Sequence, residues 1–408
     1  MKGSSRRGKR EASGAGRAFR IAVSVEHVRA WGRQVCEGIA RYVGQNGSWS
    51  IDLFEDGFTR DADISRYDGF LCCITTRECA DRLVATERPV IDLLTDVAHP
   101  QTVHVGSSHV HCGRLAAQHL MARHFRNFAF CGWDGLGFSR AREKAFAEEL
   151  ARKGFDYHAY HSPRTSIHQY VGRSVLREKL ELPEDFRKID AWLRRLPKPV
   201  AIFCANDMRA WQINEICRRQ AVRVPEVVAV LGADNDNIPC LLTTPSLSSV
   251  DTDTSEIGYQ AAATLGAILV GKRSASDFSE VLVLPREVEN RGSTAIFPVE
   301  PPYLAAALSY IHSHVEKGIL ASDVIRHVGV SYQTLANAFR DKLGTTVQKE
   351  IMESRMECAE HLLRSSSMSL KEVAAVSGFK TQQYFSSCFR AKYAVAPGEW
   401  RAGKGIGQ

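Results

Sequence analysis

The sequence lacks any run of 18 or more apolar residues, so nothing in its 408 residues has the length of a membrane-spanning helix. It also lacks a Cys-x-x-Cys pair and any Cys/His cluster at metal-ligand spacing, so neither a metal nor another cofactor is expected. Of its eleven cysteines, Cys72, Cys73 and Cys79 lie closest together, in or beside an apolar run typical of buried strands. Such scattered cysteines are typical of a protein in a reducing cytosol.

Signatures of catalysis are missing as well. There is no Gly-x-Ser-x-Gly motif and no phosphate-binding loop, and the Gly135-Leu-Gly137 stretch lacks the remaining glycines of a dinucleotide fingerprint. No apolar segment precedes Arg20, which argues against a secretory signal and hence against a solute receptor that serves a permease. We therefore expect a cytoplasmic protein that is not an enzyme.

Charge is unevenly distributed along the chain. The net charge is +7, and residues 1–20 alone hold seven Lys/Arg against one Glu. Residues 301–408 hold thirteen Lys/Arg against nine Asp/Glu, which leaves the middle of the chain mildly acidic. Basic ends suit a polyanion such as nucleic acid. The first 19 residues are expected to be a disordered basic tail.

From Arg20 to about residue 270, short apolar runs alternate with amphipathic helices. Strands that alternate with helices predict parallel sheets covered on both faces, and the length suggests two α/β lobes with a ligand site in the cleft between them. The expected strands are 21–25, 49–54, 69–74, 89–93, 128–132, 201–204 and 227–231. The expected helices are 32–42, 115–124, 141–153, 208–220 and 258–270, and 190–196 is expected to end another.

Polar residues follow several of these strands. In open α/β sheets, ligand-binding groups lie on the loops after the carboxyl ends of the strands. Carboxylates, amides and guanidinium groups can bond sugar hydroxyls, and an aromatic face can cover the apolar side of the ring. Each such residue could equally be a helix cap or a turn residue. The candidates for ligand binding are Arg33, Arg142, Asn206, Asp207, Asp234 and Asn235.

The stretch from Ala321 to Arg401 contains the same short sequence pattern twice: a helix, a glycine turn and a second helix with a polar outer face. The two glycines, Gly329 and Gly378, lie 49 residues apart. Ser331 and Thr381 are expected to cap the second helix of each unit. Two helix-turn-helix units in one small all-α domain are a DNA-reading arrangement.

The outward faces of the two second helices carry the candidate DNA contacts. Gln and Asn can pair with adenine edges and Arg with guanine, although a solvated helix face would also be polar. The low charge of both faces favours base reading over phosphate binding alone. The candidates are Tyr332, Gln333, Asn337 and Arg340 in the first unit, with Ala336 beside them, and Gln382, Gln383, Ser386, Ser387 and Arg390 in the second.

These residues resemble the AraC/XylS family of DNA-binding domains over about 100 residues. The resemblance rests on Ser331, Leu335 and Phe339, on Leu343-Gly344, on Ser377-Gly378-Phe379, and on Tyr384-Phe385, Phe389, Pro397 and Trp400-Arg401. The chain departs from the family at Tyr332, where Arg is usual, at Asn337, where Arg is common, and at Ala394, where Gly is usual. The first two departures should change which bases the first helix reads.

The middle region resembles the LacI/GalR type of periplasmic-binding-protein-like domain, through Asn206-Asp207, Val230–Asn235, Leu247–Val250 and Gly258–Ala262. The two resemblances together imply a dimeric regulator, an activator of transcription that works with RNA polymerase on an operator of double-stranded DNA and responds to a monosaccharide such as xylose. They also imply Arg142, Asp207 and Asp234 as sugar contacts. Ser108-His109 stands where Asp-Asn is frequent, which leaves the identity of the effector open.

The predicted organisation is therefore an α/β two-lobed periplasmic-binding-protein-like domain followed by an all-α domain with two helix-turn-helix units. Its boundaries are a tail at 1–19, a ligand and dimerisation domain at 20–292, a proline-containing linker at 293–302 and a DNA-binding domain at 303–408. One alternative keeps the DNA-binding role but makes the α/β region a dimerisation module, or a module for a ligand that is not a sugar. A remoter alternative is a solute-binding receptor.

Overall fold

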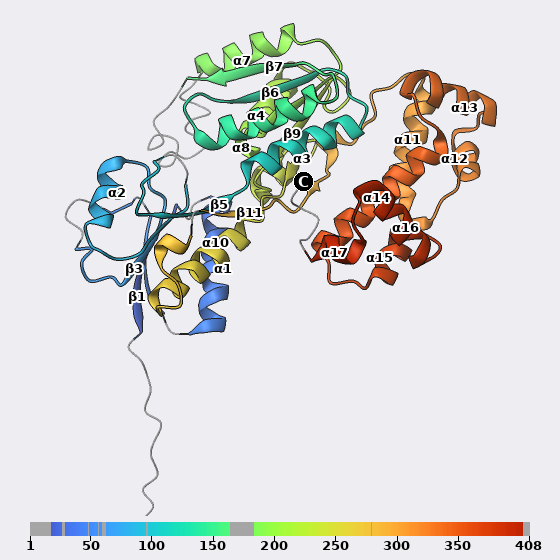
Figure 1. Ribbon diagram of the computed structural model, residues 1–408. Coiled ribbons are helices and arrows are strands. Elements are labelled where there is room, and N and C mark those ends of the chain that lie inside the picture. The colour runs from blue at the N-terminus through green and yellow to red at the C-terminus, as the bar shows by residue number, and fades with distance from the viewer. Residues whose placement is uncertain are drawn as a thin grey trace, which may run out of the picture. The chain divides into compact units, whose positions relative to one another are not determined.

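Figure 1 shows the computed structural model of the chain. It describes residues 18–26, 29–47, 49–55, 57–58, 63–94, 97–163, 183–278 and 280–402. All but the last two residues of the predicted basic tail lie outside this range. The chain divides into two compact units, one formed mainly by residues up to Val105 together with Gly258–Val281, and the other formed mainly by Gly106–Ile257 and Leu282 onward.

The first unit is built on a six-stranded sheet in the order β11-β5-β4-β3-β1-β2. β1 pairs with β2 and β3, β3 with β4, and β4 with β5, all in parallel. The strands are β1 (Phe19–Ser24), β2 (Trp49–Phe54), β3 (Gly69–Cys72), β4 (Val90–Asp92), β5 (Val103–Ser107) and β11 (Glu280–Val283). The helices are α1 (Ala30–Asn46), α2 (Arg77–Val84) and α10 (Thr254–Leu269).

Helices α1 and α10 pack closely against each other. A Cβ at Gly258 would lie 2.0 Å from the Val35 carbonyl oxygen, and a Cβ at Gly266 would lie 2.2 Å from the Tyr42 hydroxyl. Glycine at these two positions of α10 therefore lets the helices approach. The Tyr42 ring also lies edge-on to Tyr259 at 5.6 Å between centroids.

The second unit contains another six-stranded sheet, in the order β12-β10-β9-β8-β6-β7. Its strands are β6 (Phe128–Trp133), β7 (Tyr157–Ser162), β8 (Val200–Cys204), β9 (Val228–Ala233), β10 (Ser248–Val250) and β12 (Val288–Glu289). The pairs β6–β7, β6–β8, β8–β9 and β9–β10 are parallel, as predicted. The two-residue β12 runs antiparallel to β10, whereas parallel sheets were predicted. Nothing in the sequence of β12 indicates this direction.

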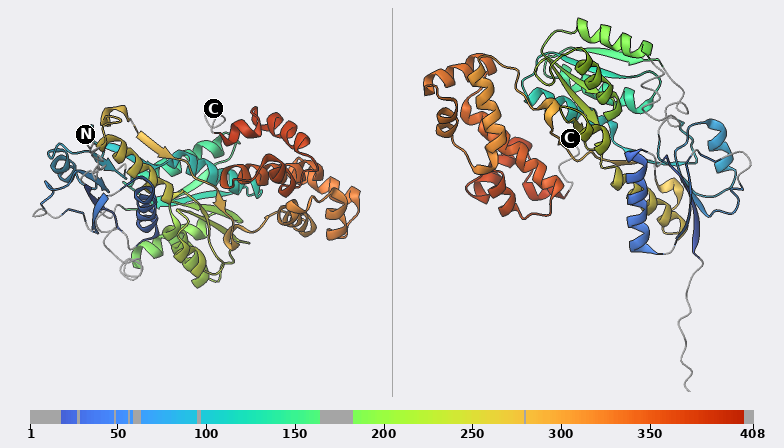
Figure 2. Two further views of the ribbon diagram at one scale, coloured as in Figure 1. Left: turned by 90° about the horizontal axis from the view of Figure 1, so that it is seen from below. Right: turned by 180° about the vertical axis from the view of Figure 1, so that it is seen from behind.

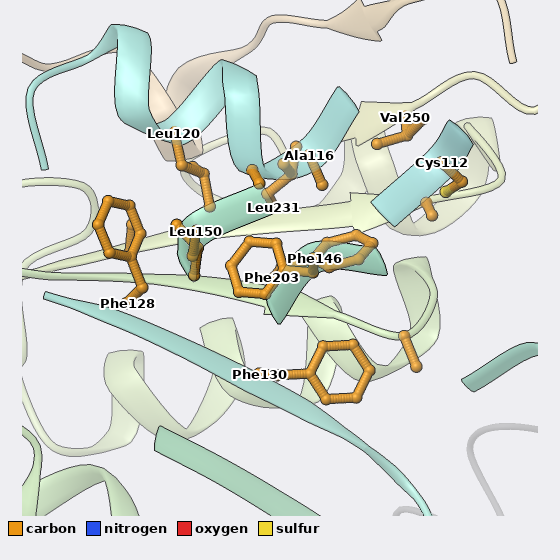
Figure 3. Close-up of a cluster of buried hydrophobic side chains, with 14 of the residues drawn as sticks. Cys112, Ala116, Leu120, Phe128, Phe130, Phe146, Leu150, Phe203, Leu231 and Val250 are labelled. Carbon is orange, nitrogen blue, oxygen red and sulfur yellow. The ribbon is translucent and has the colours of Figure 1, made fainter. Parts of the chain in front are cut away.

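Helices cover both faces of this sheet, because side chains of successive strand residues point to opposite faces. Ala201 and Phe203 of β8 join a core under α3 (His109–Ala122) and α4 (Gly137–Ala151), which Figure 3 shows in close-up. Val200, Ile202 and Cys204 join a second core under α7 (Pro183–Arg195), α8 (Asp207–Arg219) and α9 (Asn237–Leu242). The prediction of a sheet covered on both faces is confirmed here.

The C-terminal part of the second unit is helical, as Figure 2 shows in two further views. Its helices are α11 (Pro302–His314), α12 (Ala321–Val328), α13 (Tyr332–Ala338), α14 (Val347–Ser365), α15 (Leu370–Val376), α16 (Gln382–Tyr393) and α17 (Pro397–Arg401). Two hydrophobic cores share the long α14. Val347 and Ile351 at its start pack with the first helix-turn-helix unit, and Met356, Ala359 and Leu363 pack with the second.

The expected helices and strands are present, with ends that differ by a few residues. α3 begins six residues earlier than predicted, at His109. The ranges expected for the α/β region do not include α2, β5, β7, α9 or β10–β12, and α17 was not expected either. β7 contains several polar residues, so it does not form the apolar run that predicts a buried strand. α9 has only six residues, one of them a proline, which is too short to show a helical period. Among the helices within the described ranges, none is long and apolar enough to cross a membrane.

Candidate ligand site and nucleic-acid interface

An arginine–aspartate pair lies at the carboxyl ends of the strands in the second unit. Arg142 on α4 donates from Nη2 to Asp234 Oδ1 at 2.7 Å, and from Nη1 to the Ala205 carbonyl oxygen at 2.7 Å. Arg142 is 3% exposed, whereas the Asp234 side chain is 21% exposed. Burial disfavours the guanidinium charge, but the Asp234 carboxylate, together with Cys112 and Asp207, raises the pKa of Arg142 above its usual value. A fixed cation thus holds a carboxylate at the surface of the lobe.

The backbone at Asp234 is in an unusual conformation. Asp234 and Asn235 have φ angles of +96° and +51°, a region that residues with a side chain rarely adopt. Consecutive residues in this region cost roughly 1–3 kcal/mol each and tend to occur at functional sites. The surrounding hydrogen bonds must therefore hold this loop. Asp207 accepts one of them directly, from the Asp236 N–H, and contacts Asn235 indirectly through the Ser249 hydroxyl.

Asp207 braces the loop from inside the protein. It is 2% exposed. Its Oδ1 accepts from the Ser249 hydroxyl at 2.5 Å, and its Oδ2 accepts from the Asp236 backbone N–H at 2.7 Å. Burial, and next the charge of Asp234, raise the pKa of Asp207 well above its usual value. Gly232 is required beneath it, because a Cβ there would lie 2.1 Å from Asp207 Oδ1.

Asn206 and Asn235 also have partners within the protein. The Asn206 side chain caps α8 by accepting from the Arg209 backbone N–H at 3.0 Å, which is the helix-cap role weighed in the sequence analysis. Asn235 Oδ1 accepts from Arg291 Nη2 at 2.7 Å, and its backbone N–H donates to the Ser249 hydroxyl at 3.0 Å. Arg33 is an exposed residue of α1 in the other compact unit. The structure therefore brings Arg142 and Asp234 together, with Asp207 and Asn235 behind them.

A buried network that the sequence pattern did not predict is centred on Arg209. Its Nη1 lies 3.2 Å from Asp185 Oδ2, and its Nη2 donates to the Ser162 hydroxyl at 2.8 Å. The guanidinium carbon lies 4.1 Å from the centre of the Trp133 ring, and Arg209 is 1% exposed. An arginine in a helix normally indicates a solvated position, so sequence pattern alone could not place it here. The one feature of the sequence that could have indicated its role is that Arg209 follows Asn206-Asp207 closely in the chain.

Two aromatic rings lie between the two arginines. Arg142 lies over Phe138 at 5.4 Å, and Phe138 is edge-on to Trp133 at 6.4 Å between ring centroids. The His109 ring lies 6.2 Å from Phe138, at the start of α3. Ser108, before it, is buried and bonds His111 Nδ1 through its hydroxyl at 2.7 Å. The lobe thus combines a carboxylate, a guanidinium and aromatic rings, the groups that suit a polyhydroxylated ligand.

The two helix-turn-helix units follow the predicted design. Gly329 closes α12 with φ +70°, and the Ser331 hydroxyl accepts from the Thr334 N–H at 3.1 Å to cap α13. Gly378 follows α15 with φ +80°, and the Thr381 hydroxyl accepts from the Tyr384 N–H at 3.2 Å to cap α16. Ser369 and Glu372 form a capping box at the start of α15.

The inward and outward faces of α13 and α16 are also as predicted. Leu335, Phe339, Phe385 and Phe389 are fully buried. The candidate DNA contacts lie on the outer faces: Tyr332, Gln333, Arg340, Gln382, Gln383, Ser387 and Arg390 are exposed, and Ala336, Asn337 and Ser386 are half-buried. The last turn of the first unit, Phe339–Leu343, is π-helical, which places Arg340 outside the regular α-helix.

Comparisons with known proteins agree with this organisation. The family described as "Periplasmic binding protein-like domain" matches residues 117–294, and the family described as "Helix-turn-helix domain" matches residues 324–403. The "Xylose operon regulatory protein" of Escherichia coli K12 is 28% identical over 94% of this chain and 96% of its own length. The protein of the same name from Haemophilus influenzae is 27% identical over 94% of this chain and 98% of its own.

A solved structure described as "xylose-binding transcription activator xylR" covers 95% of this chain and 98% of its own, with 26% identity and a TM-score of 0.57. The fold and the two helix-turn-helix units thus define a transcription regulator in which a periplasmic-binding-protein-like domain precedes a DNA-binding domain, and the resemblance inferred from the sequence is confirmed. Over nearly its whole length, the chain is similar to the xylose operon regulatory proteins. By their names, these relatives regulate an operon.

Proposed function

We propose that this chain is a cytoplasmic, homodimeric transcription activator whose effector is a monosaccharide, with a pentose such as xylose as the first candidate. The observation that carries the effector assignment is the Arg142–Asp234 pair, held on a strained loop beside Phe138 and Trp133. The names of the full-length relatives support a pentose. Of the residues predicted from the sequence, Arg142 and Asp234 are the proposed ligand contacts, with Asp234 as the main acceptor of sugar hydroxyls, and Asp207 braces the loop that carries Asp234.

The ligand acts on DNA binding only through a difference in its affinity for two states of the protein. Bound sugar would favour one state of the ligand domain, and that state would place the two DNA-binding domains of a dimer for the operator and for RNA polymerase. A gel-shift titration on the DNA upstream of the neighbouring genes tests the proposal. Specific binding that a pentose strengthens is expected. Absence of any specific shift, at low and at physiological salt, would overturn it.

Replacing Asp234 by alanine should abolish the ligand-induced rise in melting temperature. A ligand at one hundred times its Kd stabilises the native state by about 2.7 kcal/mol, which a thermal-shift screen against monosaccharides detects readily. Asp234→Asn removes the negative charge but keeps an acceptor for Arg142, so it separates the effect of the carboxylate charge from the effect of the hydrogen bond. Asp190→Ala removes another Arg–Asp pair of this unit and should leave the shift unchanged. An unchanged shift in Asp234→Ala would remove Asp234 from the site.

The proposed dimer has a candidate surface on α9. Ile238, Leu241 and Leu242 are 57%, 61% and 79% exposed on this short helix. Adjacent exposed apolar side chains mark interaction sites more often than single ones do. Leu242→Glu should shift the protein from dimer to monomer in analytical ultracentrifugation, whereas Val270→Glu, at another exposed apolar residue, should not. A Leu242→Glu protein that stays dimeric would exclude this surface.

A further inference from the structure

The outer face of the first recognition helix carries a hydrogen-bonded triad. Asn337 Oδ1 accepts from Gln333 Nε2 at 2.8 Å and from Arg340 Nη2 at 2.7 Å. Gln333 lies four residues before Asn337, and Arg340 lies three residues after it, so all three share one face. One carboxamide oxygen therefore orients the two side chains of this face that are best suited to read base edges.

The second recognition helix has no such triad. Its equivalent residues, fifty positions later, are Gln383, Ser387 and Arg390. Within the described part of the chain, no hydrogen bond joins these three side chains. A serine hydroxyl is too short to reach both neighbours, as an asparagine amide does. The triad is therefore a property of this position, where the chain departs from the arginine common in the family.

The backbone contributes to the triad. α13 ends at Ala338, and the next five residues, Phe339–Leu343, form a π-helical turn that ends at Gly344, with φ +66°. Such turns are rare and are frequent at functional sites. Arg390, by contrast, lies within the regular helix α16. Arg340 is the second residue of this turn, and Phe339, fully buried, anchors the turn in the core.

We propose that Asn337 is a positioning residue for base reading and that its carboxamide presets Gln333 and Arg340 before DNA is bound. Gln333 retains Oε1 and its second Nε2 hydrogen, the pair that recognises adenine, and Arg340 retains N–H groups for guanine. The first unit then reads an adenine and a guanine together in one segment of the major groove. This inference rests on the proposed DNA-binding function.

Orienting Gln333 and Arg340 before binding should raise the affinity for DNA, because long side chains lose conformational entropy when they bind. For each side chain that is already ordered, roughly a 2- to 10-fold gain in affinity is expected. The gain applies only to DNA that offers both bases, because other sequences do not engage the two side chains. Loss of Asn337 should therefore reduce discrimination between sequences, with little effect on attraction to the phosphate backbone.

The test uses the full-length protein and an operator selected from a pool of random DNA. Gln333→Ala and Arg340→Ala first identify the base pair that each side chain reads. Discrimination is the Kd for a single-base variant divided by the Kd for the operator. Asn337→Ala should then lower this ratio by about tenfold, and the loss should occur at both base pairs and not at one alone. Binding to nonspecific DNA and its salt dependence should not change. Asn337→Asp keeps both acceptor contacts and should retain the discrimination, with weaker binding to every DNA.

The matched control is Ser387→Ala at the equivalent position of α16. Because Ser387 is itself a candidate contact, any loss of discrimination that it causes should fall on the second unit's base pairs and leave those of the first unit unchanged. If the wild-type protein shows no sequence preference, the proposed function fails. If the wild-type protein is selective and Asn337→Ala remains equally selective, this inference fails while the function stands. Loss of discrimination at a third base pair only would make Asn337 a direct base contact and would also overturn it.

Discussion

Replacing Arg209 by methionine should destabilise the second sheet and its helices by about 3–5 kcal/mol, the range for breaking a buried ion pair from one side. Methionine keeps much of the apolar stem but leaves Asp185 without its cationic partner. Asp185 would keep the hydroxyl donors of Ser162 and Tyr160, which bond it at 2.7 Å and 3.0 Å. Neither hydroxyl compensates a carboxylate that is only 14% exposed. The contact of Arg209 with the Trp133 ring is lost as well.

The same helix offers a matched control. Arg218 of α8 makes two bonds to Glu215 at 2.9 Å, but its side chain is 64% exposed. Exposed ion pairs contribute little to stability because solvent screens them, so Arg218→Met should have little effect. Hydrogen exchange of the amides in β8 and α8, in the full-length protein, measures both changes locally. An equal loss of protection in the two variants would show that the buried network around Arg209 contributes no more than a surface pair.

The contrast between Asp207 and Asp234 shows where sequence-based reasoning stops. Both follow a buried strand, and both were predicted as ligand contacts on that ground. Asp234 carries the surface carboxylate, whereas Asp207 turns inward to Ser249, which lies 42 residues away. The difference depends on Gly232 leaving room and on a distant hydroxyl. Long-range packing decides such details, and one sequence does not display it.

The helix-turn-helix units were predictable because local rules govern them. Ser331, Thr381 and the Ser369–Glu372 pair cap their helices within three residues of sequence, and the buried residues recur at helical spacing. The π-helical turn at Phe339–Leu343 had no such local signal. Nothing in its sequence distinguishes it from the regular turn of α16. The departures from the family at Tyr332 and Asn337 were visible, but the triad around Asn337 needed the structure.

Replacing Gly378 by alanine should destabilise the second helix-turn-helix unit by roughly 3 kcal/mol, more than the same change at Gly329 destabilises the first. Both glycines have left-handed φ angles, +80° and +70°, and an alanine there costs about 1–2 kcal/mol from backbone conformation alone. Beyond this common cost, the two positions differ in the space around them. A Cβ at Gly378 would lie 2.4 Å from the Val315 carbonyl oxygen, whereas nothing lies within 4 Å of one at Gly329.

The collision at Gly378 involves backbone, which cannot rotate away as a flexible side chain could. Relief would require α15 and α16 to move from the turn at Val315–Gly318, and such small-to-large changes typically add about 1–3 kcal/mol. Hydrogen exchange of the amides of α15 and α16 in Gly378→Ala, compared with α12 and α13 in Gly329→Ala, measures the difference. Equal losses would mean that the φ angle alone requires glycine at both turns. A larger loss at Gly378 would show that this glycine also joins the second unit to the segment between α11 and α12.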